Sequence, residues 1–169
     1  MKKIFLFCLV AMVPIIVYSQ KGTLKNLDNK MGFKSITLGA PISKYYGKVK
    51  IMRDSKDMYD VTDSTLLYIG NDIKLKFILI KTYNDSIFSI NIFAKPNDSE
   101  RIISIFNNAY GDYSKISTSD KYFWYGEKVE LVLDDSDSRW CLSVFTDRKL
   151  QFSKETKDYK NVKKDSDDI

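Results

Sequence analysis

The chain has 169 residues, a formal net charge of +5, 44% hydrophobic residues and two cysteines. This composition is typical of one ordinary folded domain, and it excludes collagen-like, low-complexity and disulfide-rich chains. The sequence contains no histidine, which excludes Ser-His-Asp and Cys-His catalysis and histidine-ligated zinc.

The N-terminus has the pattern of a secretion signal. Lys2 and Lys3 precede an apolar run over residues 4–17, and Ser19 supplies the small residue before a cleavage site. The run of about 14 residues is shorter than the roughly 20 of a membrane span. We expect residues 1–19 to be a signal peptide, and the mature protein to be periplasmic or secreted without a transmembrane span. An uncleaved anchor is the alternative.

Cleavage would lower the charge by two and would remove Cys8, so that Cys141 is the single remaining cysteine. The basic residues are interspersed with acidic ones and form no stripe with interleaved aromatics. We therefore expect no nucleic-acid partner, and no motif in the sequence calls for a cofactor.

In the first half of the chain, some stretches have a clear secondary-structure pattern and others have a weak one. Residues 20–31 are polar and predict a flexible leader, and residues 33–39 alternate as a first strand. Pro41 suits the first turn of a short helix that Gly47 ends. The following elements are predicted as strands near residues 49–52 and 58–61, a hairpin of 65–69 with 73–82, and a strand over 87–94.

A helix over residues 97–110 is the clearest element of the second half. Asn97 and Glu100 have the spacing of a capping box, an apolar stripe runs from Ile102 to Tyr110, and Gly111 stops the helix. Strands over 122–125, 129–133 and 139–146 follow. The charge-dense residues 149–169 predict a disordered tail.

Two stretches of the chain share a pattern. Residues 123–133 and 67–77 each combine an aromatic residue, a glycine and alternating apolar residues. Trp124 aligns with Tyr68, and the glycines at 70 and 126 align as turns. We interpret residues 36–94 and 97–146 as copies of a helix-strand-strand-strand unit, with chance alternation in a β-rich chain as the alternative. An α+β domain over residues 32–148 would follow, with about six or seven antiparallel strands and two helices on one face.

Residues 36–41, Ile-Thr-Leu-Gly-Ala-Pro, lead into a short helix that ends at Tyr46-Gly47. This opening, with the later aromatic-Tyr-Gly hairpin, resembles small bacterial envelope domains of the SmpA/BamE-like fold and the tandem β-lactamase-inhibitor-protein fold. The chain departs from that group because it has no lipobox cysteine and a shorter first helix. The resemblance implies a protein-binding envelope module that is not an enzyme.

Two features of the sequence are candidate sites of chemistry. Asp134, Asp135 and Asp137 form an acidic cluster, but the glycine and distal glutamate of a calcium loop are missing, so we expect a solvated turn. Cys141 should lie on the sheet face opposite the core with Arg139 beside it, where a lowered thiol pKa would suit a nucleophile. A small packed side chain is the favoured interpretation.

Apolar residues are also expected on the sheet face that points away from the core. We predict Phe123, Tyr125, Phe93 and Phe145 as partner-binding residues there, alongside Ile78 and Ile80, with Trp124 in the core. Unless the segment 48–63 or the tail covers this face, it should bind another envelope or secreted protein. The alternatives are a binder of lipid or peptide between sheet and helices and, third, a hydrolytic enzyme, which the missing histidine disfavours.

Overall fold

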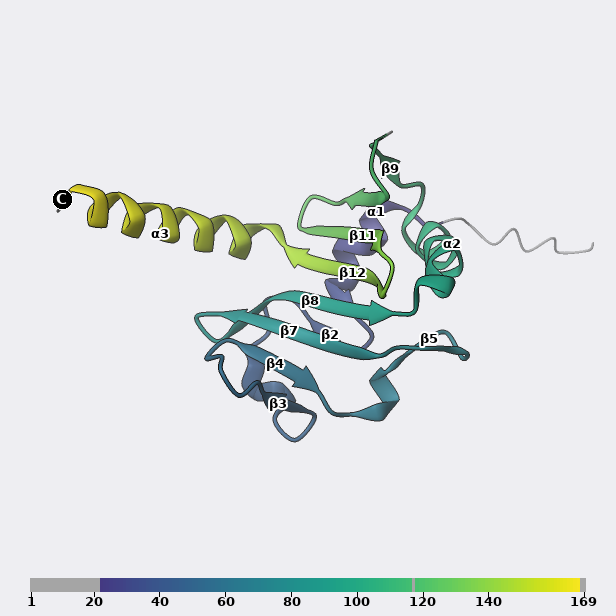
Figure 1. Cartoon of the computed structure of the whole chain (residues 1–169), viewed down its shortest axis with the longest axis horizontal. Helices are drawn as coiled ribbons and strands as arrows, with labels where there is room; N and C mark the ends of the chain where they lie inside the picture. Colours follow the sequence, from purple (N-terminus) through teal and green to yellow (C-terminus); the bar gives the residue numbers. More distant parts are fainter. Residues whose placement is uncertain (1–21, 117, 168–169) are drawn as a thin grey trace, which may run out of the picture.

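The computed structural model describes residues 22–116 and 118–167, and its centre is a large antiparallel sheet (Figure 1). In the described part of the chain, this main sheet has eight strands in the order β3-β4-β7-β8-β12-β11-β10-β9. They are β3 (Val49–Ile51), β4 (Met58–Val61), β7 (Phe77–Tyr83), β8 (Ser86–Ala94), β9 (Ser114–Lys115), β10 (Lys121–Tyr125), β11 (Val129–Asp137) and β12 (Trp140–Asp147). The α+β class and the antiparallel sheet are confirmed. The strand count of six or seven was too low, in part because β9 forms in a stretch without alternation and pairs with the edge of β10.

Two short hairpins lie outside the main sheet. The strands β1 (Gly32–Phe33) and β2 (Ile36–Thr37) pair with each other, as do β5 (Tyr68–Ile69) and β6 (Ile73–Lys74). The predicted strand over 33–39 is therefore wrong as a single element, because Lys34 has a φ of 51° and reverses the chain. Gly70 has a φ of 62°, which glycine adopts without steric cost, and it forms the turn predicted for the second hairpin.

The helix α2 (Ser99–Tyr110) confirms the most strongly patterned element of the sequence. Ile102, Phe106 and Tyr110 are buried along one stripe, and Gly111 caps the C-terminus with a φ of 88°. The predicted capping box does not form. A 3-10 turn, η3 (Pro96–Asp98), precedes the helix, so that Asp98 is the N-cap and makes no side-chain cap bond. The other 3-10 turns are η1 (Ile42–Tyr45), which was predicted as a short helix, and η2 (Ser64–Leu66).

Both segments that were predicted to lack structure contain helices. Residues 20–31 include α1 (Leu24–Lys30), whose Leu27 is completely buried in the core. The tail forms α3 (Arg148–Asp167), which projects from the body of the molecule (Figure 1). The prediction of two helices is thus corrected to three α-helices in the described ranges. The predicted signal peptide, residues 1–19, lies outside the described residues.

The core lies between one face of the main sheet and α1, α2, η1 and the β1–β2 hairpin, and we call this side the inner face. In Figure 1, α1 and β2 lie behind the strands. Cross-strand pairing sets one row of the inner face, Ile80, Ile90, Phe145, Leu131 and Trp124, and each of these side chains is completely buried.

Trp124 is fixed in this core, as predicted, by rings and by one hydrogen bond. The Phe106 ring lies 5.6 Å from its indole and 5.8 Å from the Phe145 ring, in edge-to-face geometry in both cases. The indole Nε1 donates a hydrogen bond of 2.9 Å to the Gly111 carbonyl oxygen. Burial of the indole therefore leaves its polar atom with a partner.

Candidate functional site: the outer face of the sheet

The opposite side of the main sheet, which we call the outer face, is also largely apolar. The residues that alternate with the inner row form the row Leu79, Asn91, Val144, Val132 and Phe123 across five strands. Four of the five side chains are apolar, and each of those four is partly exposed. An antiparallel sheet with one solvated face usually places polar residues there, so this face differs from an ordinary solvated surface.

An aromatic cluster occupies the end of the outer face near the β11–β12 turn. The Phe77 and Phe93 rings stack with their centroids 4.2 Å apart. Trp140 packs edge-on against them, with its ring 5.5 Å from Phe77 and 6.3 Å from Phe93. Phe93 and Leu142 are paired across β8 and β12, so the cluster is continuous with the apolar row. Three aromatic side chains in contact form a rigid apolar surface, which is typical of binding surfaces.

A second aromatic pair lies at the other side of this face, on β10. Phe123 and Tyr125 stack with a centroid distance of 5.5 Å and nearly parallel rings. Tyr125 is 47% exposed. Burial of part of the ring and the neighbouring Glu130 carboxylate raise the pKa of Tyr125 despite the opposing charge of Arg148. Its hydroxyl therefore stays protonated near neutral pH and offers a hydrogen-bond donor at the rim.

Polar side chains lie between the apolar row and α3. Ser89 and Thr146 are buried on the outer face, and Ser89 Oγ donates a hydrogen bond of 3.2 Å to Asn91 Oδ1. A hollow of about 380 Å³ lies over these residues, and α3 contributes Gln151, Lys154 and Glu155 to its wall. The first turns of α3 therefore border the outer face without crossing it.

A groove of about 770 Å³ runs along the outer face at the β3 edge. Its apolar wall includes Phe77, Leu79 and Met52, while Lys50 and Arg53 bring positive charge. Its lining residues are Lys50, Ile51, Met52, Arg53, Asp60, Phe77 and Leu79. The Oδ1 atom of Asp60 is buried and has no hydrogen-bond partner among the described residues. A buried acceptor without a partner costs free energy, so a donor from a bound molecule would stabilise it.

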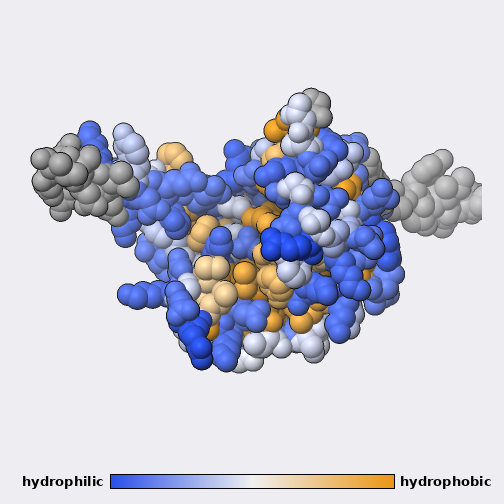
Figure 2. Space-filling view, in the orientation of Figure 1, coloured by the Kyte–Doolittle hydropathy of each residue, from blue (hydrophilic) through white to orange (hydrophobic). Residues whose placement is uncertain are grey.

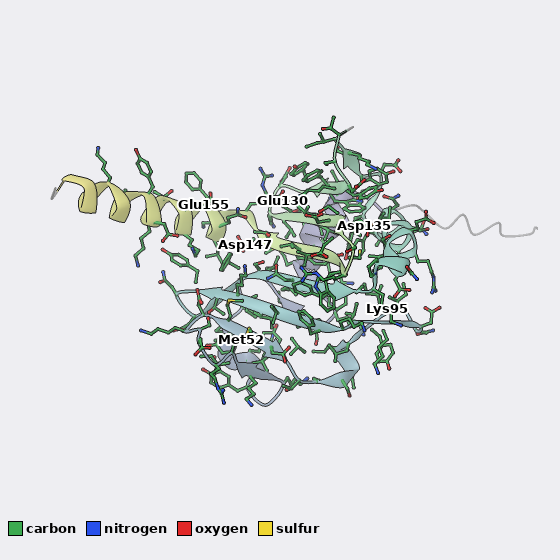
Figure 3. All side chains as sticks on the ribbon, viewed as in Figure 1. Met52, Lys95, Glu130, Asp135, Asp147 and Glu155 are labelled. Carbon is green, nitrogen blue, oxygen red and sulfur yellow. The ribbon has the colours of Figure 1, made fainter. Side chains whose placement is uncertain are left out.

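Of the two segments predicted as possible covers, the tail reaches one end of the outer face and the segment 48–63 does not lie over it. Residues 48–63 form β3 and β4, which extend the sheet sideways, and α3 leaves from the end of β12 (Figure 1). Figure 2 shows hydrophobic residues gathered over the middle of this side, within a frame of hydrophilic ones. Figure 3 labels residues at the border of the face, Glu130 on β11, Met52 beyond β3 and Glu155 on α3. Among the described helices, α3 reaches the end of the face around Ser89 and Thr146, and the aromatic cluster of Phe77, Phe93 and Trp140 has no helix over it.

Three of the four predicted binding residues, Phe123, Tyr125 and Phe93, lie on the outer face. Phe145 does not. It is completely buried on the inner face, where its ring lies 6.1 Å from that of Phe33. Ile78 and Ile80 are likewise buried in the core. The prediction assigned these residues to the wrong face because both faces are apolar, and alternation alone does not say which face is covered.

The pairing register shows which residues of the face were missed. Phe77, Leu79, Trp140, Leu142 and Val144 lie on the outer face. The prediction that Cys141 faces away from the core implied that its neighbours Trp140 and Leu142 point into the core. A bulge between β7 and β8 places Phe88 on the outer side, where it borders the hollow near α3. The bulge has no signal in the sequence.

Cys141 also lies on the inner face, not beside Arg139 as predicted. Its side chain is completely buried. Burial, together with the carboxylates of Asp135, Asp98 and Asp134, raises the pKa of Cys141 to about 12. Arg139 instead pairs with Asp137 at 2.9 Å. The thiol is thus a small packed group, as the favoured interpretation had it, and its high pKa opposes a nucleophilic role.

In the acidic cluster at the end of β11, Asp134 and Asp137 pair with different basic residues. Asp134 pairs with Lys121 at 2.9 Å, and Asp137 accepts two bonds from the Arg139 guanidinium. Across residues 22–116 and 118–167, no three His, Cys, Asp or Glu side chains converge in the manner of a metal site. Asp134 and Asp137 therefore stabilise the turn region through ion pairs and hydrogen bonds.

The described helices include none with the length and apolar character required to span a bilayer. Comparisons of the chain with protein-family models, with curated proteins and with solved structures found no match. The outer face is therefore the feature from which a function has to be argued.

Proposed function

We propose that this protein is an exported, non-catalytic module of the bacterial cell envelope that binds another protein through the outer face of its sheet. The observation that carries the proposal is the uncovered aromatic cluster of Phe77, Phe93 and Trp140, continuous with Leu142 and Val144. Monomeric proteins rarely leave an apolar patch of this kind in water unless it meets a partner.

Two further observations support a binding role over an enzymatic one. The chain has no histidine, the commonest general base near neutral pH. The thiol of Cys141, with a pKa of about 12, is buried in the core, away from the outer face. The resemblance of residues 36–47 to small envelope domains agrees with export and protein binding, and we keep it as part of this proposal.

Affinity capture with three forms of the exported chain tests the proposal. The forms are the native chain, Val144→Ser on the outer face, and Ile116→Ser as control, since Ile116 is 56% exposed and lies outside the face. We expect a protein from an envelope extract to bind the native chain and the control, and to be lost with Val144→Ser. Equal capture by all three forms would contradict the proposal.

The groove at the β3 edge favours a second candidate function, the binding of a lipid or peptide. Its volume of about 770 Å³ lies within the range of small-ligand sites. The space between sheet and helices, which was the alternative ligand site in the sequence analysis, is filled by side chains such as Phe106 and Phe145. Native mass spectrometry distinguishes the two functions, because a ligand of defined mass on the purified chain would favour the groove.

We also propose that residues 36–94 and 97–146 derive from one duplicated unit. Ile73 aligns with Val129 and Leu75 with Leu131, and all four side chains are buried. The aligned hairpins now differ in their place, because β5 and β6 form a separate small sheet whereas β10 and β11 belong to the main one.

A further inference from the structure

The outer face becomes polar at the end that lies beside α3. The pairing register places Lys81 opposite Ser89, and Ser89 opposite Thr146, across β7, β8 and β12. Ser89 and Thr146 are buried, and so is Asn91, two residues further along β8 on the same face, at 7% exposure. Side chains directly opposite each other in a sheet have Cβ atoms about 5 Å apart. Four polar side chains therefore converge at one place on the sheet.

The first turns of α3 form a fixed wall beside these side chains. The helix starts at Arg148, directly after the last residue of β12. Asp147 Oδ1 accepts the N–H of Leu150 at 3.0 Å, which caps the first turn. The N–H of Arg148 donates to the Lys128 carbonyl at 3.0 Å, and its guanidinium to the Gly126 carbonyl at 2.7 Å. These bonds hold the wall in place, so that the hollow between helix and sheet is a preformed part of the fold.

The hollow has one polar and one apolar side. Its volume of about 380 Å³ lies at the lower end of the range of small-ligand sites. Phe88, Leu142 and Val144 line the apolar side, and each is partly exposed. The four polar side chains of the sheet line the other side. A ligand that fills the hollow should therefore be small and amphipathic.

The charged side chains of α3 at the hollow already have partners. Lys154 Nζ pairs with Asp158 Oδ2 at 2.8 Å, and Glu155 Oε1 accepts a hydrogen bond of 2.8 Å from Gln151 Nε2. Figure 3 labels Glu155 on this part of the helix. Lys81, on the sheet side, has no ion-pair partner among the described residues. Its ammonium group therefore brings a positive charge to the hollow that no described side chain neutralises.

Two polar atoms of the sheet also lack a partner. Asn91 Oδ1 accepts the hydrogen bond of Ser89 Oγ, but Asn91 Nδ2 and Thr146 Oγ1 make no hydrogen bond to any described residue. Most polar atoms of buried side chains have at least one partner. The Lys81 ammonium and the Asn91 amide nitrogen can only donate, and the Thr146 hydroxyl can donate as well. A single acceptor group with a negative charge would satisfy all three.

We propose that this hollow binds a small carboxylate with an apolar body. The carboxylate accepts hydrogen bonds from Lys81, Asn91 and Thr146, and the apolar body lies against Leu142 and Val144. Hydrogen bonds between charged groups are roughly twice as strong as those between neutral ones, which favours a carboxylate over a neutral polar group. The inference goes beyond the proposed function, because it assigns a small molecule to a part of the outer face other than the aromatic cluster.

An NMR titration of the ¹⁵N-labelled exported chain with benzoate tests the site. We expect saturable shifts of the Asn91 side-chain amide and of backbone amides in β7, β8 and β12. Benzamide keeps the ring without the charge, and inorganic phosphate keeps a negative charge without an apolar body. Each should bind at least about tenfold more weakly than benzoate. The absence of a saturable shift with benzoate, or equal affinity for either of the other two probes, overturns the inference.

Two variants identify the groups that bind. Lys81→Met keeps most of the alkyl stem and removes the charge, so it should raise the dissociation constant for benzoate by about tenfold. Thr146→Val replaces the hydroxyl with a methyl group of similar shape and should raise it by about three- to tenfold. Lys56→Met is the matched control, because Lys56 is exposed in the turn between β3 and β4.

Circular dichroism of each variant checks that it is folded, and Thr146→Val tests the site if Lys81→Met does not fold. Native affinity in both variants, or the same loss of affinity in Lys56→Met as in Lys81→Met, would contradict the proposed site. Capture of an envelope protein is measured separately, so that failure of the carboxylate site leaves the proposed function intact.

Discussion

The carboxylate of Asp28 occupies the space into which a side chain at Gly126 would project. Asp28 lies on α1 and accepts N–H bonds from Glu127 at 2.8 Å, Lys128 at 2.8 Å and Val129 at 3.0 Å, all in the turn between β10 and β11. A Cβ atom at Gly126 would overlap Asp28 Oδ1. The glycine is therefore required by a close approach between two segments, since its φ is not in the left-handed region.

The first prediction concerns this contact. Gly126→Ala should lower the free energy of unfolding by about 1–3 kcal/mol, because the new methyl group displaces the carboxylate from the turn. Urea unfolding followed by circular dichroism measures the loss. In an Asp28→Ala background the same change should cost less, since its opposing group is gone. Equal costs in the two backgrounds would show that the overlap is not the cause.

The second prediction is a pH dependence of the same contact. Burial opposes ionisation of Asp28, but the N–H bonds of Lys128, Val129 and Glu127, with the charge of Lys128, outweigh it and lower the pKa below 3.8. A lowered folded-state pKa adds stability above the unfolded pKa, and that stability is lost as the pH falls through the folded value. The stability difference between the native chain and Asp28→Asn should therefore be largest near neutral pH and shrink in acid, as the pH falls through the lowered pKa of Asp28. Unfolding curves of both proteins at neutral and at acidic pH test this, and a stability difference that does not change with pH would contradict it.

The third prediction concerns Trp124. Trp124→Ala should cost about 3–5 kcal/mol of stability, because it empties a completely buried site beside Phe106. Trp124→Phe keeps a ring but leaves the Gly111 carbonyl without its donor, and it should cost less. Thermal unfolding measured by circular dichroism orders the two variants. A loss below about 1 kcal/mol for the alanine variant would be incompatible with the burial of the indole.

The fourth prediction separates two phenylalanines that the sequence had grouped together. Phe145→Ala should destabilise the fold by about 3–5 kcal/mol, because Phe145 is completely buried. Phe93→Ala should cost less, because Phe93 lies partly exposed on the outer face, but it should weaken capture of a partner. Unfolding curves measure the two stabilities, and the capture assay measures partner binding. If Phe93→Ala destabilised the fold more than Phe145→Ala, the assignment of Phe145 to the inner face and Phe93 to the outer face would be wrong.

The fifth prediction concerns the reactivity of Cys141. In a Cys8→Ser background it is the single thiol, and burial with a pKa of about 12 should make it slow to react with a disulfide reagent at neutral pH. Reaction should become fast once urea unfolds the chain. The absorbance of the released thiolate measures both rates, and a fast reaction in the folded state would mean that the thiol is accessible.

The parts of the fold that the sequence predicts well are those with local signals. The apolar stripe of α2 and the alternation in β10 and β11 each specify an element from residues a few positions apart. The placement of Trp124 in the core follows from the same kind of pattern.

The parts that the sequence misses depend on distant contacts. α1 is polar except for a few residues, yet Asp28 binds backbone atoms about 100 positions away, a contact that no local pattern indicates. In β12, Trp140, Leu142 and Val144 form the more apolar side and would be assigned to the core. The structure buries Cys141, Ser143 and Phe145 instead. When both sides of a strand are apolar, the packing of the helices decides which side is covered. The sequence alone therefore placed only some residues of the outer face correctly.

The pairing of β8 with β12 has a consequence for how the protein folds. It joins residues such as Ile90 and Phe145, which are separated by about fifty residues and lie at the centre of the sheet. On either side of this pair, β7–β8 and β10–β11–β12 are meanders whose neighbouring strands are close in sequence. Closing a long loop costs more entropy than closing a hairpin. We therefore expect each meander to form early and the central pair to join them last, so that the seam between β8 and β12 governs the rate at which the sheet becomes whole.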